Sequence, residues 1–155
     1  MLALKIDKSE IKSFMNVLLR QDAFSEFETR GVEISTFADF SINGAFDENY
    51  SSDERKEVHC LWKRLQPYVF NILKGAARPK LLKITFSLPA SKLPVIHENA
   101  ASCFINLVYQ NGEAVCSTAV SQKSFSLDKS VDVAWDESVL AFFRKNKIPF
   151  IEEHI

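Results

Sequence analysis

The sequence predicts an α+β fold, in which about three helices pack on one side of a largely antiparallel sheet. Several segments alternate between apolar and polar residues, and short turns join them, which indicates β-hairpins. Three other segments carry apolar residues at helical spacing. The order of the elements also suggests two halves of the β-α-β-β type. The chain has 155 residues, the usual size of one domain, so we expect a single globular domain over residues 1–155.

The first predicted elements are a strand and a helix. Residues 2–6 alternate in polarity and predict a short strand. Asp7 can cap the helix that follows, and Glu10 stands three residues later, as in a capping box. An apolar stripe then predicts a helix over residues 11–20. Residues 23–29 fit the tail of this helix or a strand.

A hairpin and a second helix are predicted next. Two alternating runs within residues 32–46 flank a two-residue break, a pattern that predicts a β-hairpin. The polar residues 47–57 are expected to form a surface loop that can open a helix. Helical spacing of apolar residues over 58–73 predicts the second helix, with a kink or a split at Pro67. Gly75 is predicted to end it.

The next part of the chain is predicted to consist mostly of strands. Alternation predicts strands over residues 82–88, 103–109 and 114–120. The pair Asn111-Gly112 predicts a tight hairpin between the last two, because both residues tolerate a positive φ. A loop with two prolines is expected to connect the first of these strands to the second.

Three further elements are predicted near the C-terminus. Phe125 and Leu127 suggest one more strand after the hairpin. Apolar residues over 135–143 predict a third helix, which Pro149 stops. Residues 150–151 suggest an edge strand.

Charge and cysteine content indicate the protein's surroundings. The formal net charge is −1, so general binding to nucleic acid or to a membrane surface is not favoured. Cys60, Cys103 and Cys116 lack metal-binding or redox spacing, and we expect them to remain reduced. No apolar run has the roughly 20 residues of a membrane span, and the N-terminus lacks a signal-peptide pattern. We therefore expect a cytoplasmic protein with no membrane partner.

Residues with catalytic or metal-binding chemistry are isolated in the sequence. His59 and Cys60 are neighbours, but on the predicted helix their side chains would point in different directions. His97 stands beside Glu98 in a loop, where a solvated histidine is expected. The glycines form no phosphate-binding motif. The sequence therefore predicts no catalytic residue, no cofactor and no metal site, and it favours a protein that is not an enzyme.

One basic pattern suggests a surface for phosphates or for an acidic partner. It would form if the first two predicted helices lie side by side with their polar faces outward. The cations that would contribute to it are Lys8, Lys12, Arg20, Lys63, Arg64 and Lys74. A solvated helix face is the more common meaning of such a pattern, and nearby acidic residues dilute the positive charge.

Motifs along almost the whole chain carry a resemblance to a protein family. They are MLALKI at the N-terminus, Thr36-Phe37 with Phe40, Trp62 through Pro67 with Lys74-Gly75, Asn111-Gly112, SFSLDKS at 124–130 and AWD at 134–136. Together they resemble an uncharacterised Gram-positive bacterial family known only as a domain of unknown function. The resemblance implies no activity, ligand or functional residue.

A weaker, topological resemblance is to one domain of a DNA sliding clamp. A strand, a helix with a basic outer stripe and antiparallel strands follow one another, and this succession is repeated once. The corner from Thr36 to Asp39 is similar to a clamp corner, with Phe37 and Ala38 inserted. This resemblance implies a clamp-like domain, and a ring would require several copies.

Three functions follow as hypotheses. The leading one is a non-enzymatic binding or assembly module that recognises an unknown protein, or its own copies, through a sheet edge or an apolar groove. The first alternative is a nucleic-acid-associated, clamp-like domain that uses the basic surface. The second is a small enzyme or ligand-binding protein with an unmarked pocket near His59 or His97.

Overall fold

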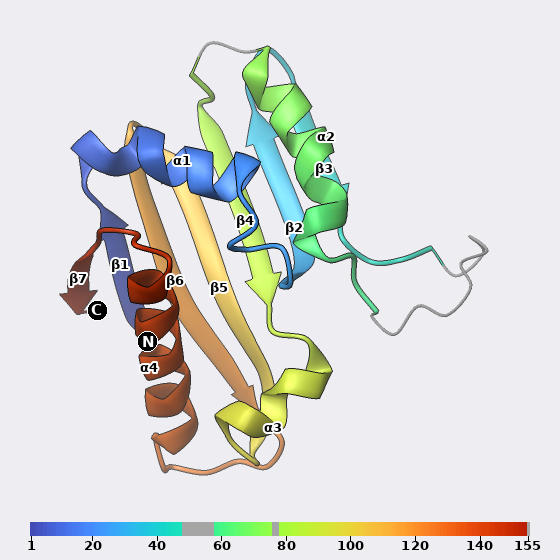
Figure 1. Ribbon diagram of the computed structural model, residues 1–155. Helices are drawn as coiled ribbons and strands as arrows, with labels where there is room; N and C mark the ends of the chain where they lie inside the picture. Colours follow the sequence, from blue (N-terminus) through green and yellow to red (C-terminus); the bar gives the residue numbers. More distant parts are fainter. Residues whose placement is uncertain (48–57, 76–77, 155) are drawn as a thin grey trace.

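Seven antiparallel strands form one sheet in the computed structural model, which describes residues 1–47, 58–75 and 78–154 (Figure 1). The strands are β1 (Leu2–Ile6), β2 (Glu28–Ser35), β3 (Asp39–Asn43), β4 (Leu81–Ser87), β5 (Ala100–Gln110), β6 (Glu113–Gln122) and β7 (Ile151–His154). Their order across the sheet is β3-β2-β4-β5-β6-β1-β7, with every neighbouring pair antiparallel. This continuous order does not divide the described strands into the two suggested halves.

Helices cover one face of this sheet. They are α1 (Ile11–Arg20), α2 (Trp62–Lys74), α3 (Leu93–Ile96) and α4 (Ser130–Lys145), with short 3-10 turns η1 (Lys8–Glu10) and η2 (Ala90–Lys92). Figure 1 shows α1, α2 and α4 in front of the sheet, with α3 near the lower end of α4. The predicted α+β class, with its antiparallel sheet, is confirmed. None of the described helices combines the length and the apolar character needed to cross a membrane.

The hydrophobic core lies between the sheet and the helices. Alternate strand residues such as Ile84, Phe86 and Leu107 are fully buried against the helical layer. The ring of Phe86 stacks on Phe24 at 5.1 Å and meets the edge of Trp62 at 5.3 Å. These aromatic contacts join the α1–β2 connection, β4 and α2 into one core.

Several local predictions are confirmed. The Asp7 carboxylate accepts hydrogen bonds from the backbone N–H (2.9 Å) and the hydroxyl (2.7 Å) of Ser9, and these bonds lower the Asp7 pKa. This cap holds η1, which leads into α1. Glu10 contributes its backbone N–H, which donates to the Asp7 carbonyl oxygen, rather than its side chain. Asn111 and Gly112 have φ values of 56° and 75°, so the predicted tight turn joins β5 to β6.

The predicted start of the second helix is wrong. Instead of continuing a helix from residue 58, the segment before Trp62 is extended, with bridges from Ala45 to His59 and from Glu28 to Leu61. Long-range backbone pairing therefore overrides the local helical spacing. Pro67 lies inside the continuous helix α2, which is not split. The predicted loop over 47–57 lies outside the described residues except for its first residue.

The predicted strand at Phe125 and Leu127 is also wrong. These side chains are 87% and 85% exposed, and the chain between β6 and α4 forms bends. The backbone N–H of Ser126 donates to the Gln122 side chain (3.0 Å), and that of Asp128 donates to the Ser126 hydroxyl (3.1 Å). Such side-chain bonds replace a strand ladder. The helix α3, in turn, was not predicted.

Candidate functional site

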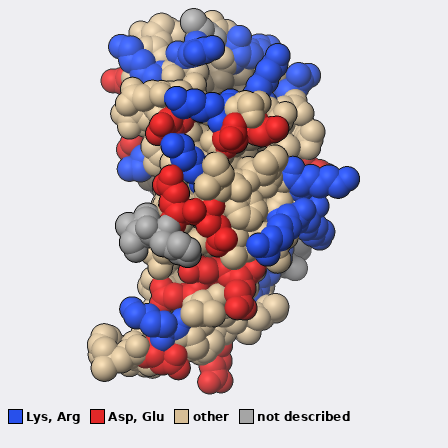
Figure 2. All heavy atoms as spheres, turned by 90° about the vertical axis from the view of Figure 1, so that its left-hand side faces the viewer, with Lys and Arg blue, Asp and Glu red and all other residues tan. Residues whose placement is uncertain are grey.

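The structure separates the six predicted basic residues into groups, although all six are exposed. Lys8 and Lys12 belong to η1 and the start of α1, whereas Arg20 ends α1 about 12 Å further along its axis. On the side shown in Figure 2, Lys and Arg gather at the upper end and along the right-hand edge, and Asp and Glu lie mainly across the middle and lower part. Positive and negative charges are therefore mixed on this side of the molecule, which is not a uniformly positive face.

The first two helices do contact each other, as the basic-surface hypothesis requires. The Gln66 side chain of α2 donates to the carbonyl oxygens of Leu18 (2.9 Å) and Gln21 (2.8 Å) at the end of α1. Near this junction Arg20 and Lys74 both lie over the ring of Phe70, at 5.7 and 5.9 Å.

The other two cations of α2 have different neighbours. The Lys63 ammonium lies 3.3 Å from the Glu26 carboxylate, and both side chains are mostly exposed. The Arg64 guanidinium lies over the Phe46 ring at 5.7 Å. Glu26 therefore offsets part of the positive charge that the sequence suggested for this helix.

His59 and Cys60 lie on the extended segment before α2 and not on a helix. The His59 Nδ1 atom lies 3.9 Å from the Glu28 carboxylate, at a hollow of about 440 Å³ that Leu88 and Leu93 also line. Burial, and to a smaller extent the charge of Arg30, lower the pKa of His59. The imidazole is therefore neutral near pH 7.

His97 contacts Ser130, the first residue of α4, but the geometry opposes nucleophilic catalysis. The His97 Nε2 and Ser130 Oγ atoms are 3.0 Å apart. The His97 Nδ1 atom accepts the backbone N–H of Asn99 at 3.0 Å. A neutral imidazole that accepts at Nδ1 carries its proton on Nε2, so Nε2 donates to the serine and cannot take up the hydroxyl proton. This contact anchors α4 to the loop before β5.

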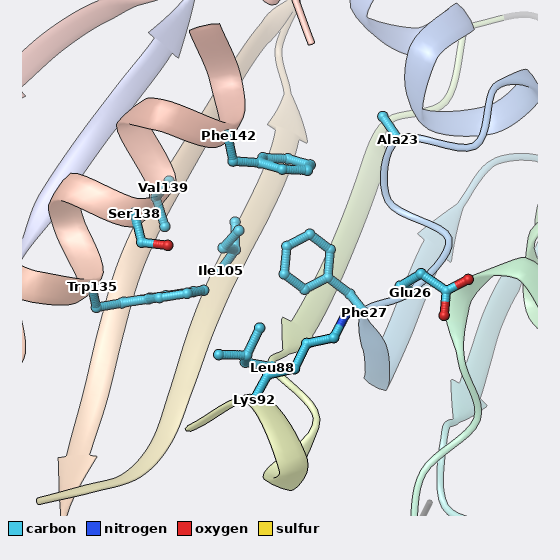
Figure 3. A pocket seen from close by; sticks show the side chains of 10 residues that line it. All are labelled: Ala23, Glu26, Phe27, Leu88, Lys92, Ile105, Trp135, Ser138, Val139 and Phe142. Carbon is cyan, nitrogen blue, oxygen red and sulfur yellow. The ribbon is translucent and has the colours of Figure 1, made fainter. Parts of the chain in front are cut away.

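A pocket of about 280 Å³ lies on the helical face, between α4 and the connection from α1 to β2. In Figure 3 the rings of Phe27, Trp135 and Phe142 surround a common space above Ile105 of β5. Trp135 and Ile105 are almost fully buried, and Phe27 and Phe142 are half-buried. The pocket is therefore an opening in the helical layer that reaches the aromatic core.

Hydrogen bonds and ring contacts hold the pocket walls in place. The Trp135 indole N–H donates to the Phe104 carbonyl oxygen of β5 at 2.9 Å, which fixes the ring plane. Phe27 and Phe142 meet edge to face at 5.2 Å. The Phe27 carbonyl oxygen also accepts the backbone N–H of Trp62 at 2.8 Å, which ties this wall to the start of α2. The pocket is thus preformed by four segments that are distant in sequence.

Three polar residues stand at the mouth of the pocket, namely Glu26, Lys92 and Ser138. In Figure 3 the Glu26 carboxylate points away from the cavity, toward the side on which α2 lies. Lys92 is exposed and has no ion-pair partner among the residues that the structure describes. The mouth therefore offers one free positive charge and one hydroxyl beside an apolar interior.

The sequence contained the pocket residues but no signal that they converge. Phe27 lay in the stretch that fitted a helix tail or a strand, and Lys92 lay in a predicted loop. Trp135 was correctly placed on the apolar stripe of a helix. The adjacent pair Phe142-Phe143 did indicate that one of the two rings lies away from the core under the helix, because neighbours on a helix point in different directions. Phe143 is fully buried, and Phe142 lines the pocket.

Comparison with known protein families gives a match over most of the chain. Residues 17–151 match the family of unknown function DUF5721. No curated protein matches the chain. No solved structure matches it either, so the resemblance to a sliding clamp gains no support.

Proposed function

Since the chain belongs to the family of unknown function DUF5721, we propose that it is a binding module whose aromatic pocket receives an apolar side chain of a protein partner. The observation that carries this proposal is the preformed cavity, with Trp135, Phe27 and Phe142 around an opening to solvent. Buried aromatic and aliphatic anchors that fill such pockets dominate the energetics of many protein interfaces.

The size of the pocket supports a side chain as its occupant. Its volume of about 280 Å³ is slightly below the range of about 300 to 1,000 Å³ that is usual for small-molecule sites. A nucleotide or another large cofactor would protrude from it. One aromatic or branched aliphatic side chain would be enclosed on several sides, and its neighbours in the partner would lie on the rim.

Charge at the mouth favours an acidic residue next to this side chain. Lys92 offers a positive charge that no described residue pairs with, and the nearby Glu26 carboxylate is engaged with Lys63. A carboxylate in the partner that reaches Lys92 would add a charge-assisted contact at the rim. The proposed partner therefore presents an apolar residue flanked by Asp or Glu.

Two naphthalene probes test the pocket itself. The anionic probe 1-anilinonaphthalene-8-sulfonate and the uncharged N-phenyl-1-naphthylamine share an apolar body and differ in one charge. We expect both to bind the folded protein and to quench Trp135 emission. Ser138→Phe, which adds a ring at the mouth, should abolish binding of both probes. Lys92→Gln should weaken only the anionic probe, by roughly three- to tenfold, the equivalent of about 1 kcal/mol.

Lys80→Gln is the matched control, since Lys80 is also exposed but lies just before β4, away from the pocket lining. It should change neither affinity. Cooperative unfolding of each variant would show that the probes report on the native protein. Failure of both probes to bind, or equal binding to Ser138→Phe, would overturn the pocket as a binding site.

Peptide selection tests the chemistry of the partner. A random peptide library selected on the wild type, and counter-selected on Ser138→Phe, should yield peptides with an aromatic or branched aliphatic residue beside an acidic one. Those peptides should displace the naphthalene probes. Enrichment of basic or purely polar peptides would contradict the proposed partner.

One observation supports nucleic-acid binding as a second candidate function. Arg20 and Lys74, from two different helices, both lie over Phe70 and provide two cations beside an aromatic ring. Binding to labelled DNA should then fall steeply between about 50 and 200 mM salt, and Arg20→Glu with Lys74→Glu should abolish it. An unchanged affinity in this variant, or no binding at either salt concentration, would exclude this surface.

A further inference from the structure

The sheet has a second face, opposite the helices, that no described helix covers (Figure 1). Its side chains alternate along each strand with the buried core residues. We call this surface the open face. Among its residues are Ala3 and Lys5 of β1, Lys83, Thr85 and Ser87 of β4, Phe104, Asn106 and Val108 of β5, and Val115, Ser117 and Ala119 of β6, of which Ala3 and Ser87 are buried.

The middle of the open face is poor in charge. The positions on β5 and β6 named above carry Phe, Val, Ala, Ser and Asn. Charged residues come from the strands on either side, Lys83 and Glu33 on one side and Lys5 on the other, and the Arg30 guanidinium of β2 reaches over the Phe104 ring at 5.4 Å. A sheet face that meets only water is usually polar along every strand. The uncharged stretch around Val108 and Val115, with charged residues beside it, is instead typical of a protein interface.

One row of cross-strand neighbours shows how the charges are arranged. Strand pairing places Glu33 beside Lys83, Lys83 beside Val108, Val108 beside Val115 and Val115 beside Lys5. β5, which carries Val108, is the central strand of the seven. Glu33 therefore lies two strands to one side of the centre, and Lys5 lies two strands to the other side, in the same row.

We propose that a second copy of the chain packs against the open face, about a two-fold axis parallel to β5. This axis places Lys5 of each chain opposite Glu33 of the other and Lys83 of each chain opposite Val115 of the other, so that two identical ion pairs flank a centre formed by Val108 and Val115. An isologous contact of this kind closes as a dimer and leaves the aromatic pocket, on the other face of the sheet, free.

The next row of the open face fits the same arrangement. Its register runs from Gly31 through Thr85, Asn106 and Ser117 to Ala3. The two-fold axis brings Gly31 opposite Ala3 and Thr85 opposite Ser117. Small residues at the flanks let the two sheets approach to the roughly 10 Å of a packed sandwich, and hydroxyl groups nearer the axis can bond across it.

Both charged residues also have a neighbour of opposite charge within their own chain. The Lys5 ammonium lies 3.5 Å from the Glu113 carboxylate, and both side chains are partly exposed. Glu33 has Lys83 as its cross-strand neighbour. The second copy therefore adds a partner to a lysine that already has an ion pair and to an exposed glutamate, so their contribution lies mainly in setting the orientation of the dimer.

Charge reversal and mixing test the proposed pairing. Sedimentation velocity over a range of concentrations should show a reversible dimer for the wild type. Lys5→Glu alone opposes two carboxylates in each pair, and Glu33→Lys alone opposes two ammonium groups. Each single variant should raise the dimer dissociation constant roughly tenfold or more. An equimolar mixture of the two variants should regain wild-type affinity, because both pairs are then complementary.

Two further variants separate the interface from effects within one chain. Val108→Glu, at the proposed axis, should be monomeric and folded, because this half-buried side chain can reach solvent. Lys12→Glu reverses an exposed charge on α1 and should leave the dimer unchanged. A wild type that is monomeric throughout, a dimer unaffected by Val108→Glu, or no recovery on mixing would overturn the proposal.

Discussion

The two faces of the sheet are made by alternate residues of the same strands, yet their chemistry differs. On β5 the inward residues Cys103, Ile105 and Leu107 are buried under helices, whereas the outward residues Phe104 and Val108 are half-buried without one. The helical face encloses an aromatic core with an opening between α4 and the α1–β2 connection. The open face carries Val108 and Val115 in the middle of one row, Phe104 under Arg30, and charged residues on the strands to either side. The difference shows that one antiparallel sheet can support two separate binding surfaces.

Each face is suited to a different kind of contact. The pocket is concave and aromatic, so it can enclose one side chain of an unlike partner. The open face has a self-complementary row of charges, so it suits a second copy of the chain. The following predictions test this contrast, beginning with the largest expected effect.

Removal of one ring from each face should have very different costs. Phe86 is fully buried and contacts the rings of Phe24 and Trp62, so Phe86→Ala should lower the free energy of unfolding by about 3–5 kcal/mol. Phe104 is half-buried on the open face under the Arg30 guanidinium, and Phe104→Ala should cost about 1 kcal/mol. Denaturant unfolding at a protein concentration low enough to keep the chain monomeric would measure both. Equal costs would refute the contrast.

Thiol reactivity should also distinguish the inward cysteines of β5 and β6 from the partly exposed Cys60. Burial raises the pKa of Cys103 to about 11 and that of Cys116 to about 12. At pH 8 their thiolate fractions are then about one in a thousand and one in ten thousand. A disulfide reagent should therefore modify the partly exposed Cys60 first and the other two only after denaturation. Rapid modification of all three thiols in the native protein would show that the helical layer does not protect β5 and β6.

A smaller effect is expected from pH, and it concerns the extended segment before α2. His59 has a pKa lowered from 6.5, chiefly by burial, so below about pH 6.5 the unfolded chain binds a proton that the folded protein does not. The free energy of unfolding should thus decline as pH falls from 7 to 5. His59→Gln should make this decline shallower. If the variant and the wild type showed the same pH dependence, protonation of His59 would not destabilise the fold. That result would be expected if the Glu28 carboxylate compensated the imidazolium charge.

Local patterns in the sequence predicted much of the fold, and long-range pairing explains the errors. The Asn111-Gly112 turn depends on two residues, and α1 depends on its own apolar stripe, so both could be read locally. The segment before Trp62 has helical spacing but pairs with Glu28 and Ala45, which are far away in sequence. Propensity could not reveal this pairing.

The candidate sites were harder to predict than the fold. The pocket joins the α1–β2 connection, η2 and α4, and the row across the open face requires the order of five strands. Neither juxtaposition follows from spacing within one element. The basic stripe was visible in the sequence, but the pairing of Lys63 with Glu26 depends on how α2 packs against the segment after α1.

Amide chemical-shift mapping would test most directly the claim that the two faces bind independently. One nuclear magnetic resonance series would add the anionic naphthalene probe to dilute protein, and a second would raise the protein concentration without the probe. We expect the probe to shift amides around Phe27, Ser138 and Phe142, and concentration to shift those around Val108 and Val115. Shifts of the same residues in both series, or of none in either, would contradict two independent surfaces.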